Sequence, residues 1–163
     1  MEKGKRREKA GKAFFCELLT LLLAAVLAGI CSRFWFQLML IRGQSMAPAY
    51  HDLQFAVIDK RGEDYSYGDV IAFRCEELSA VLVKRVAACP GDEVQIKEGT
   101  LLVNGRPSAV FPQEITCAGV LEHTVRLGED QYIVLGDNLA ESKDSRHDEV
   151  GIVRAEDIIG KLL

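Results

Sequence analysis

The chain has 163 residues, 48% of them hydrophobic and 27% charged, which excludes a predominantly disordered protein and indicates one folded domain with a short extension. The net charge of −4 is unevenly distributed, because the first twelve residues carry a net +4 and the other 151 therefore carry −8. An acidic body has no surplus of lysine and arginine to neutralise phosphates, which argues against nucleic acid as its partner.

The N-terminus joins a basic head to an apolar segment. Residues 1–13 contain six lysines and arginines, and residues 14–34 carry Glu17 and Arg33 as their only charged side chains. A helix of about 20 residues crosses the roughly 30 Å hydrocarbon core of a bilayer, so residues 14–34 predict a transmembrane helix. The basic head predicts a cytoplasmic N-terminus. Residues 35–163 would then form an extracytoplasmic domain, held at the cell membrane by a single span.

Two other interpretations of residues 14–34 stay open. A secretory signal peptide also has a basic head and an apolar centre, but no clean small-x-small cleavage site before a polar mature start is present. A buried core helix normally has a polar face, whereas this segment is apolar on every side. The membrane helix is therefore preferred.

The first candidate catalytic residue follows a short apolar run at residues 38–41. Gly43 permits a tight turn and Pro48 stiffens the chain, with Ser45 between them. A serine on such a turn can present its hydroxyl beside backbone N–H groups, as a nucleophile beside an oxyanion hole requires. Taken alone, a Gly-x-Ser sequence is more often an ordinary turn.

The remainder of the chain predicts β-structure. Short apolar or alternating runs are separated by turn signals such as Pro90-Gly91-Asp92 and Asn104-Gly105. The runs lie at residues 38–41, 54–58, 69–73, 80–86, 93–96, 101–103 and 131–135. The expected fold is mainly β: an N-terminal transmembrane helix followed by an all-β, barrel-like domain.

The second candidate is Lys84, in the strand-like run 80–86. Side chains alternate along a strand, so Lys84 shares a face with Leu82 and Val86. An apolar setting disfavours the charged amine and lowers its pKa, and a neutral amine can accept the proton of a serine hydroxyl. The alternative is an edge-strand lysine that reaches water, which is the commoner case for one strand viewed alone.

A polar segment follows the run 131–135 and holds the third group of candidates. Asp144 and Arg146 can form a charge-assisted pair that fixes the loop. The hydroxyl of Ser142 can donate a hydrogen bond to a lysine amine, or accept one from it, and so orient the amine. Viewed by itself, this segment is more often a polar surface loop.

The cysteines predict neither a disulfide framework nor a metal site. Cys16 and Cys31 fall within residues 14–34, so Cys75, Cys89 and Cys117 can form at most one bridge in the domain. Neither the cysteines nor the histidines have metal-ligand spacing, and no metal or cofactor is expected.

In combination, these features resemble the type I signal peptidases of bacteria over nearly the whole chain. The resemblance consists of the basic head, the apolar segment and four blocks in order. The blocks lie at residues 43–48, 67–73, 83–92 and 136–146. Each block alone is a weak signal, but four of them in this order after an anchor are hard to obtain by chance. The short stretch between residues 92 and 132 is similar to the small members of the Gram-positive kind.

The resemblance implies a membrane-bound serine endopeptidase that removes signal peptides from exported preproteins, cutting after small residues in Ala-x-Ala sequences. It implies Ser45 as nucleophile and Lys84 as general base. Ser142 would be the hydrogen-bond partner of the Lys84 amine, and Asp144 and Arg146 would support the site. Secretory preproteins and the lipid bilayer are the implied partners.

The family selects small side chains at the first and third positions before the cut. By adjacency to the two catalytic candidates, the residues expected to line those pockets are Met39, Ile41, Leu82 and Val83. An extended substrate would add strand pairing to this recognition.

Two positions depart from the family pattern. Ala49 stands where members commonly have threonine, and Gly43 stands where some members have a serine whose hydroxyl helps the oxyanion hole. With Gly43, that help must come from the backbone N–H of Ser45 or from another group.

Three rival functions follow from other interpretations of the same features. A self-cleaving Ser/Lys peptidase of the repressor kind would have a DNA-binding head and no anchor. An inactive membrane-tethered binding module would hold peptides without cutting them. A secreted β-protein would lose residues 1–34 as a signal peptide.

Overall fold

The computed structural model describes residues 2–62 and 64–163, with the side chains of residues 2–13 and 31–34 outside the described part. The chain divides into two units, residues 1–36 and residues 37–163. The side chains of the basic head predicted at residues 1–13 therefore lie outside the described residues.

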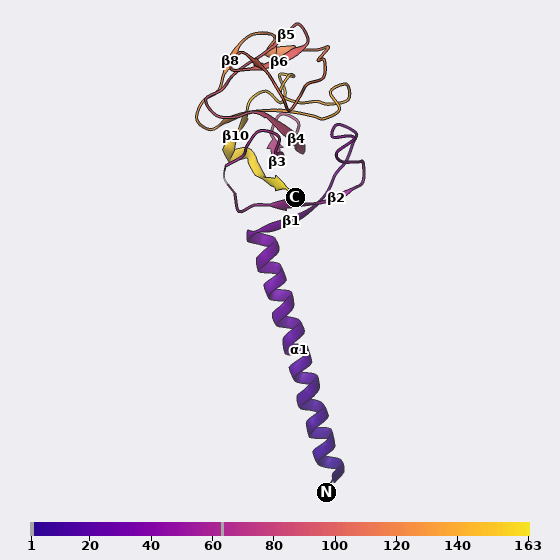
Figure 1. The fold of residues 1–163 in the computed structure, drawn as a ribbon. Helices are drawn as coiled ribbons and strands as arrows, with labels where there is room; N and C mark the ends of the chain where they lie inside the picture. Colours follow the sequence, from indigo (N-terminus) through magenta and orange to yellow (C-terminus); the bar gives the residue numbers. More distant parts are fainter. Residues whose placement is uncertain (1, 63) are drawn as a thin grey trace. The chain divides into compact units, whose positions relative to one another are not determined.

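The first unit contains one helix, α1, over Glu2–Phe34 (Figure 1). The side chains of residues 14–30 are all exposed, including Phe14, Leu22 and Ile30. Over the described residues, no helix is both long and apolar enough to cross a membrane. The predicted span at residues 14–34 includes residues 31–34, whose side chains lie outside the described part. The transmembrane helix therefore stays a prediction.

Seven strands form the larger of two sheets, in the order β1–β2–β11–β3–β4–β9–β10. Their bounds are Phe36–Leu40, Phe55–Asp59, Ile158–Leu162, Val70–Cys75, Ala80–Ala88, Gln131–Leu135 and Val153–Arg154, in that spatial order. Each strand pair with a described register is antiparallel. β3 is buried along its whole length except at Arg74, as expected for a central strand covered on both faces.

The smaller sheet has four strands in the order β7–β6–β5–β8, of which β5, β6 and β8 are labelled in Figure 1. Their bounds are Arg106–Pro107, Thr100–Val103, Glu93–Lys97 and Val125–Arg126. Two short 3-10 helices, η1 at Gly119–Glu122 and η2 at Ala155–Asp157, complete the regular structure. The prediction of a mainly β domain is confirmed.

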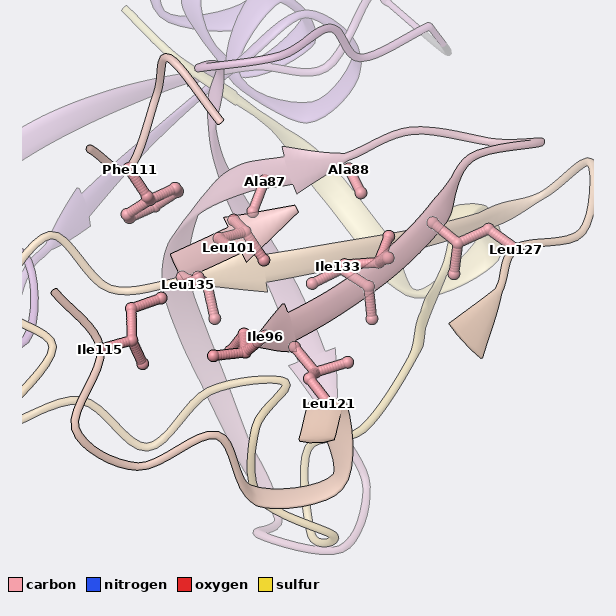
Figure 2. Packing of buried hydrophobic residues seen from close by; sticks show 11 residues of the cluster. Ala87, Ala88, Ile96, Leu101, Phe111, Ile115, Leu121, Leu127, Ile133 and Leu135 are labelled. Carbon is pink, nitrogen blue, oxygen red and sulfur yellow. The ribbon is translucent and has the colours of Figure 1, made fainter. Parts of the chain in front are cut away.

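The two sheets share a hydrophobic core. Figure 2 shows its largest cluster, in which side chains of the smaller sheet pack against the ends of β4 and β9. Its labelled members are Ala87, Ala88, Ile96, Leu101, Phe111, Ile115, Leu121, Leu127, Ile133 and Leu135. Burial of these apolar surfaces is the main force that holds β4 and β9 in place. A separate cluster packs Ile41 and Met46 against β2 and β3 and so fixes the chain on both sides of Ser45.

Strand β4 is paired along only part of one edge. β3 pairs with β4 from Val70↔Arg85 to Cys75↔Ala80. On the other edge, β9 pairs with β4 only from Arg85 onward, beginning at Arg85↔Leu135. Within the described part of the chain, residues 80–84 therefore have no strand partner on that second edge.

All seven predicted strand runs correspond to observed strands, with ends that differ by at most two residues. The short strands β7, β8 and β10 were not predicted, because two residues give no alternation to recognise. β11 was also missed, although it lies between β2 and β3. The described cysteines are free thiols, so Cys75, Cys89 and Cys117 form no bridge.

Candidate active site

The loop that carries Ser45 is held by its own backbone and by two neighbours. Gly43 has a φ of 91°, a conformation that favours glycine, and its N–H donates to Oδ1 of Asp52 at 2.7 Å. Met46 is 1% exposed and anchors the loop in the core. The N–H of Asn138 donates to the carbonyl oxygen of Ser45 at 3.0 Å. Ser45 is thus held from both sides while its side chain stays half-exposed.

Lys84 is buried, with 3% of the residue exposed. Its Nζ donates to Oγ of Ser45 at 2.7 Å and to the carbonyl oxygen of Val83 at 3.1 Å. Burial lowers the pKa of the amine from 10.5 to about 8, and the carboxylates of Asp144 and Asp137 oppose this shift only in part. A neutral amine is therefore well populated near pH 8.

The turn after β9 passes directly beside this pair. The register Arg85↔Leu135 puts the next residue, Gly136, opposite Lys84. A Cβ atom at Gly136 would lie 2.2 Å from Oγ of Ser142 and 2.5 Å from the carbonyl oxygen of Ser45. No side chain fits there, so the close approach of the two loops requires glycine.

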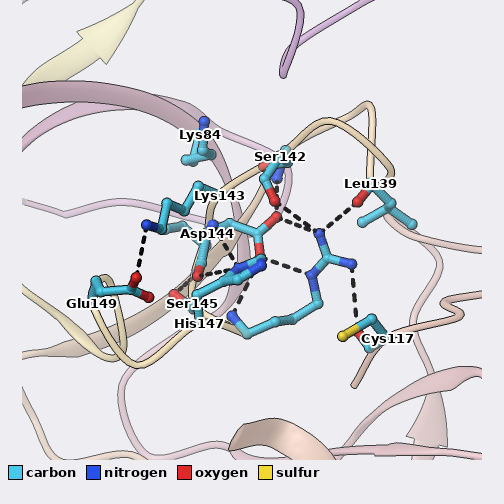
Figure 3. A network of polar contacts seen from close by, with 12 residues as sticks. Lys84, Cys117, Leu139, Ser142, Lys143, Asp144, Ser145, His147 and Glu149 are labelled. Atoms are coloured by element: carbon cyan, nitrogen blue, oxygen red, sulfur yellow. Dashed lines mark hydrogen bonds and ion pairs between the residues drawn. The ribbon is translucent and has the colours of Figure 1, made fainter. Parts of the chain in front are cut away.

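A buried ion pair holds the loop that follows (Figure 3). Arg146 Nε lies 2.8 Å from Oδ1 of Asp144, and Arg146 Nη2 lies 2.9 Å from Oδ2, with both side chains almost fully buried. Arg146 Nη2 also donates to the carbonyl oxygen of Leu139 at 2.8 Å, and the N–H of Gly136 donates to Oδ2 of Asp144 at 3.1 Å. The pair expected from the sequence therefore forms, and it connects the loop to the turn beside Lys84.

Ser142 lies in this loop and is 5% exposed. Its Oγ is buried without a hydrogen-bond partner among the described residues. The hydrogen bond predicted between Ser142 and the Lys84 amine is thus not formed in this structure. A buried hydroxyl without a partner is costly, which makes Ser142 a candidate for a contact made only when substrate is bound.

Sequence reasoning missed a second ion pair, between Arg85 and Asp137. Arg85 Nε and Nη2 lie 2.7 Å and 2.6 Å from the two carboxylate oxygens of Asp137, and Arg85 Nη1 donates to the carbonyl oxygen of Gly68 at 2.7 Å. Arg85 follows Lys84 in β4, and Asp137 precedes Asn138, which binds Ser45. The sequence shows only that Arg85 and Asp137 are charged. Their pairing depends on the register between β4 and β9, which cannot be seen in either segment alone.

A cleft of about 270 Å³ opens at Ser45 and Lys84. The four predicted pocket residues Met39, Ile41, Leu82 and Val83 all line it. Leu40, Arg42, Met46 and Val81 complete the lining, and sequence reasoning had not singled these residues out. Apart from Ser45, Lys84 and Arg42, the cleft walls are apolar.

The backbone donors near Ser45 differ in their availability. The N–H of Gly43 is engaged by Asp52. The N–H of Ser45 has no hydrogen-bond acceptor in the described part of the chain. Of these two N–H groups, that of Ser45 is the one free to donate a hydrogen bond to a ligand oxygen.

A serine hydroxyl within hydrogen-bonding distance of a buried amine whose pKa is lowered is competent for nucleophilic catalysis, because the neutral amine can accept the hydroxyl proton. The apolar cleft beside it can receive small side chains. Ser45 and Lys84 are therefore the candidate catalytic residues of this cleft.

Comparison with known proteins gives the class of protein. The model of the family described as signal peptidase, peptidase S26 matches residues 15–163. The chain is 30% identical to signal peptidase I of Bacillus licheniformis over 152 residues, which cover 86% of this chain and 81% of that protein. It is 26% identical to signal peptidase I P of Bacillus subtilis subsp. natto over 168 residues, with coverage of 94% and 90%.

The fold comparison agrees with the sequence comparison. A crystal structure of a signal peptidase I from Enterococcus faecalis V583 superimposes with a TM-score of 0.50 and 25% sequence identity. The superposition covers 61% of this chain and 97% of that chain.

The chain is therefore a serine peptidase, which is a class of hydrolase. More narrowly, it belongs to the signal peptidase, peptidase S26 family.

Proposed function

We propose that this peptidase removes signal peptides from exported preproteins, cutting after small residues in Ala-x-Ala sequences, with Ser45 as nucleophile and Lys84 as general base. The observation that carries the proposal is the 2.7 Å contact between Lys84 Nζ and Ser45 Oγ at the end of an apolar cleft. The family match and the similarity to signal peptidases I support the choice of substrate.

The proposed reaction passes through an acyl-enzyme. Ser45 Oγ attacks the scissile carbonyl carbon while its proton passes to the neutral Nζ of Lys84. The oxyanion that forms accepts a hydrogen bond from the backbone N–H of Ser45. Collapse of this intermediate breaks the C–N bond, and the leaving amine takes the proton from Lys84. A water molecule, deprotonated by Lys84, then hydrolyses the ester on Ser45 and releases the signal peptide.

Substrate binding is proposed along the unpaired edge of β4. An extended substrate can form strand hydrogen bonds with residues 80–84, which have no partner on that edge in the described chain. Alternate side chains of the substrate would then enter the cleft at Met39, Ile41, Leu82 and Val83. The cleft, with a volume of about 270 Å³, would receive both of these side chains.

The supporting roles are proposed from the contacts around the dyad. Asp144 and Arg146 would fix the position of the loop beside Lys84, because Asp144 of this buried pair also accepts a hydrogen bond from the N–H of Gly136. Ser142 would orient the amine once substrate is bound. Gly43 would supply the turn rather than an oxyanion donor, since its N–H is bound by Asp52. This chemistry uses no metal or cofactor.

Membrane attachment forms part of the proposal. Exposed apolar side chains follow α1 from Phe14 to Ile30, and six basic residues precede them. Residues 14–34 would hold the chain in the cell membrane as a single pass, with the N-terminus cytoplasmic and the domain outside. If carbonate washing releases the full chain from membranes, this part fails.

The test of the catalytic proposal is cleavage of a preprotein with an Ala-x-Ala site by the full chain in detergent. Ser45→Ala and Lys84→Met should be inactive, while the control variants Ser66→Ala and Lys97→Met, at exposed positions, should cut like wild type. Circular dichroism of all five proteins verifies that they are folded. An inactive wild type would favour a binding module, and an active Lys84→Met would remove the base from the mechanism.

A further inference from the structure

Arg42 gives the cleft a charge that the catalytic chemistry does not use. It lines the same cleft as Ser45, whose remaining walls are apolar except at Lys84. Arg42 is exposed, and no ion pair or side-chain hydrogen bond of Arg42 is found among the described residues. The planar guanidinium of an arginine is well suited to pairing with a carboxylate.

No ion pair with a neighbouring acid offsets this charge within the described part of the chain. The carboxylate of Asp52 binds the N–H of Gly43, the residue after Arg42, and forms no ion pair with the guanidinium. Lys84 adds a second positive charge below its pKa of about 8, but its side chain is buried whereas that of Arg42 is exposed. Arg42 thus places a positive charge at the rim of the cleft, whereas residues 13–163 as a whole carry a net negative charge.

The position of Arg42 relates this charge to the scissile bond. Arg42 lies two residues after Leu40, the end of β1, and three residues before Ser45. In an extended substrate, side chains alternate between the cleft and the rim. If the last residue before the cut points into the apolar cleft, the residues on either side of it point toward the rim and the solvent.

We propose that Arg42 is a specificity-determining residue that favours substrates with an acidic side chain on one of the two residues flanking the last small residue before the cut. This inference rests on the proposed function and names a substrate preference of the same site. An exposed ion pair contributes about 0.2–1 kcal/mol, which corresponds to a preference of up to about fivefold for glutamate over glutamine.

The experiment measures kcat/KM for peptides that contain one Ala-x-Ala site. In one set the middle residue is Glu, Gln or Lys, and in the other set the first residue after the cut is varied in the same way. Wild type, Arg42→Glu and the control Arg106→Glu are compared as full chains in detergent. Arg106 is exposed, lies in β7 of the smaller sheet and does not line the cleft. Arg106→Glu therefore changes the net charge of the protein as much as Arg42→Glu does, but away from the cleft.

We expect wild type and Arg106→Glu to prefer Glu over Lys in at least one set, and Arg42→Glu to reverse that order. The change in the Glu-to-Lys ratio should be about tenfold and should shrink as salt is added. If Arg42→Glu keeps the wild-type order in both sets while the Gln peptides are still cut, the inference is wrong and the proposed function stands. If wild type cuts no peptide of either set, both fail.

Discussion

Arg85 and Asp137 form a two-pronged ion pair, with contacts of 2.7 Å and 2.6 Å, between the residue after Lys84 and the turn that binds Ser45. The pair also neutralises a carboxylate that acts on the Lys84 amine. It therefore influences both the position and the charge of the proposed dyad.

Opposite pH shifts are expected when either partner of this pair is neutralised. The acid limb of kcat/KM for wild type should have its midpoint near the Lys84 pKa of about 8, because only the neutral amine acts as a base. Arg85→Met leaves Asp137 unopposed, which raises the pKa of Lys84 and moves the limb to higher pH. Asp137→Asn leaves Arg85 unopposed and moves it to lower pH. If both variants lose activity equally and their pH midpoints do not move in opposite directions, the ion pair has only a structural role.

Lys84→Met should be more stable than wild type at neutral pH. The folded-state pKa of Lys84 lies near 8, below the ordinary value of 10.5, so protonating the folded protein is unfavourable. The unfolded chain binds more protons between these values, and wild-type stability rises with pH through that window. The gain from Lys84→Met should be about 3 kcal/mol below pH 8 and vanish above pH 10.5. Denaturant unfolding at pH 7 and pH 10 measures it, and equal differences at both values would contradict the lowered pKa.

Gly136→Ala should impair activity far more than its size suggests. The added Cβ would meet Oγ of Ser142 at 2.2 Å and the carbonyl oxygen of Ser45 at 2.5 Å, so the backbone must shift. We expect a loss of about 1–3 kcal/mol in the free energy of unfolding. A shift of Ser45 by about 1 Å should lower kcat by about a hundredfold. Gly62→Ala, where an added Cβ meets nothing within 4 Å, is the matched control. Near-normal kcat in Gly136→Ala would mean that the loops can separate without cost.

Ser142→Ala separates a structural role from a positioning role. The Ser142 hydroxyl is buried and has no partner among the described residues, so its removal should not lower the free energy of unfolding. If the hydroxyl orients the amine of Lys84 during catalysis, kcat/KM should fall about 10- to 100-fold, the value of one hydrogen bond to a charged group. Unchanged kcat/KM would show that the predicted Ser142 contact has no part in the reaction.

Local patterns in the sequence identified candidates for the site but did not decide between their alternatives. Alternation along residues 80–86 placed Lys84 on an apolar face, yet that strand viewed alone still favoured a lysine that reaches water, whereas the structure buries Lys84. Asp144 and Arg146 are two residues apart, and their pairing needed no knowledge of the fold. Family resemblance added Ser45, which no local argument could have separated from an ordinary turn.

Features that depend on pairing between distant segments could not be predicted in the same way. The ion pair of Arg85 and Asp137 depends on the register of β4 and β9, which is fixed by packing of the shared core. The position of β11 between β2 and β3 likewise follows from tertiary contacts of the chain end. The capture of the Gly43 N–H by Asp52 joins residues whose closeness depends on how the loop between them folds.

The edge of β4 left open at residues 80–84 has a consequence for which proteins are spared. Only a polypeptide that presents its own backbone N–H and C=O groups can occupy that edge. A segment inside a helix or a sheet has already used those groups, and to occupy the edge it would first have to unfold. An Ala-x-Ala sequence inside such a folded segment would therefore not be cut under the proposed mode of binding. On the proposed mode of binding, recognition would depend on local disorder as well as on sequence, and cutting would be limited to chains that have not yet folded at the site.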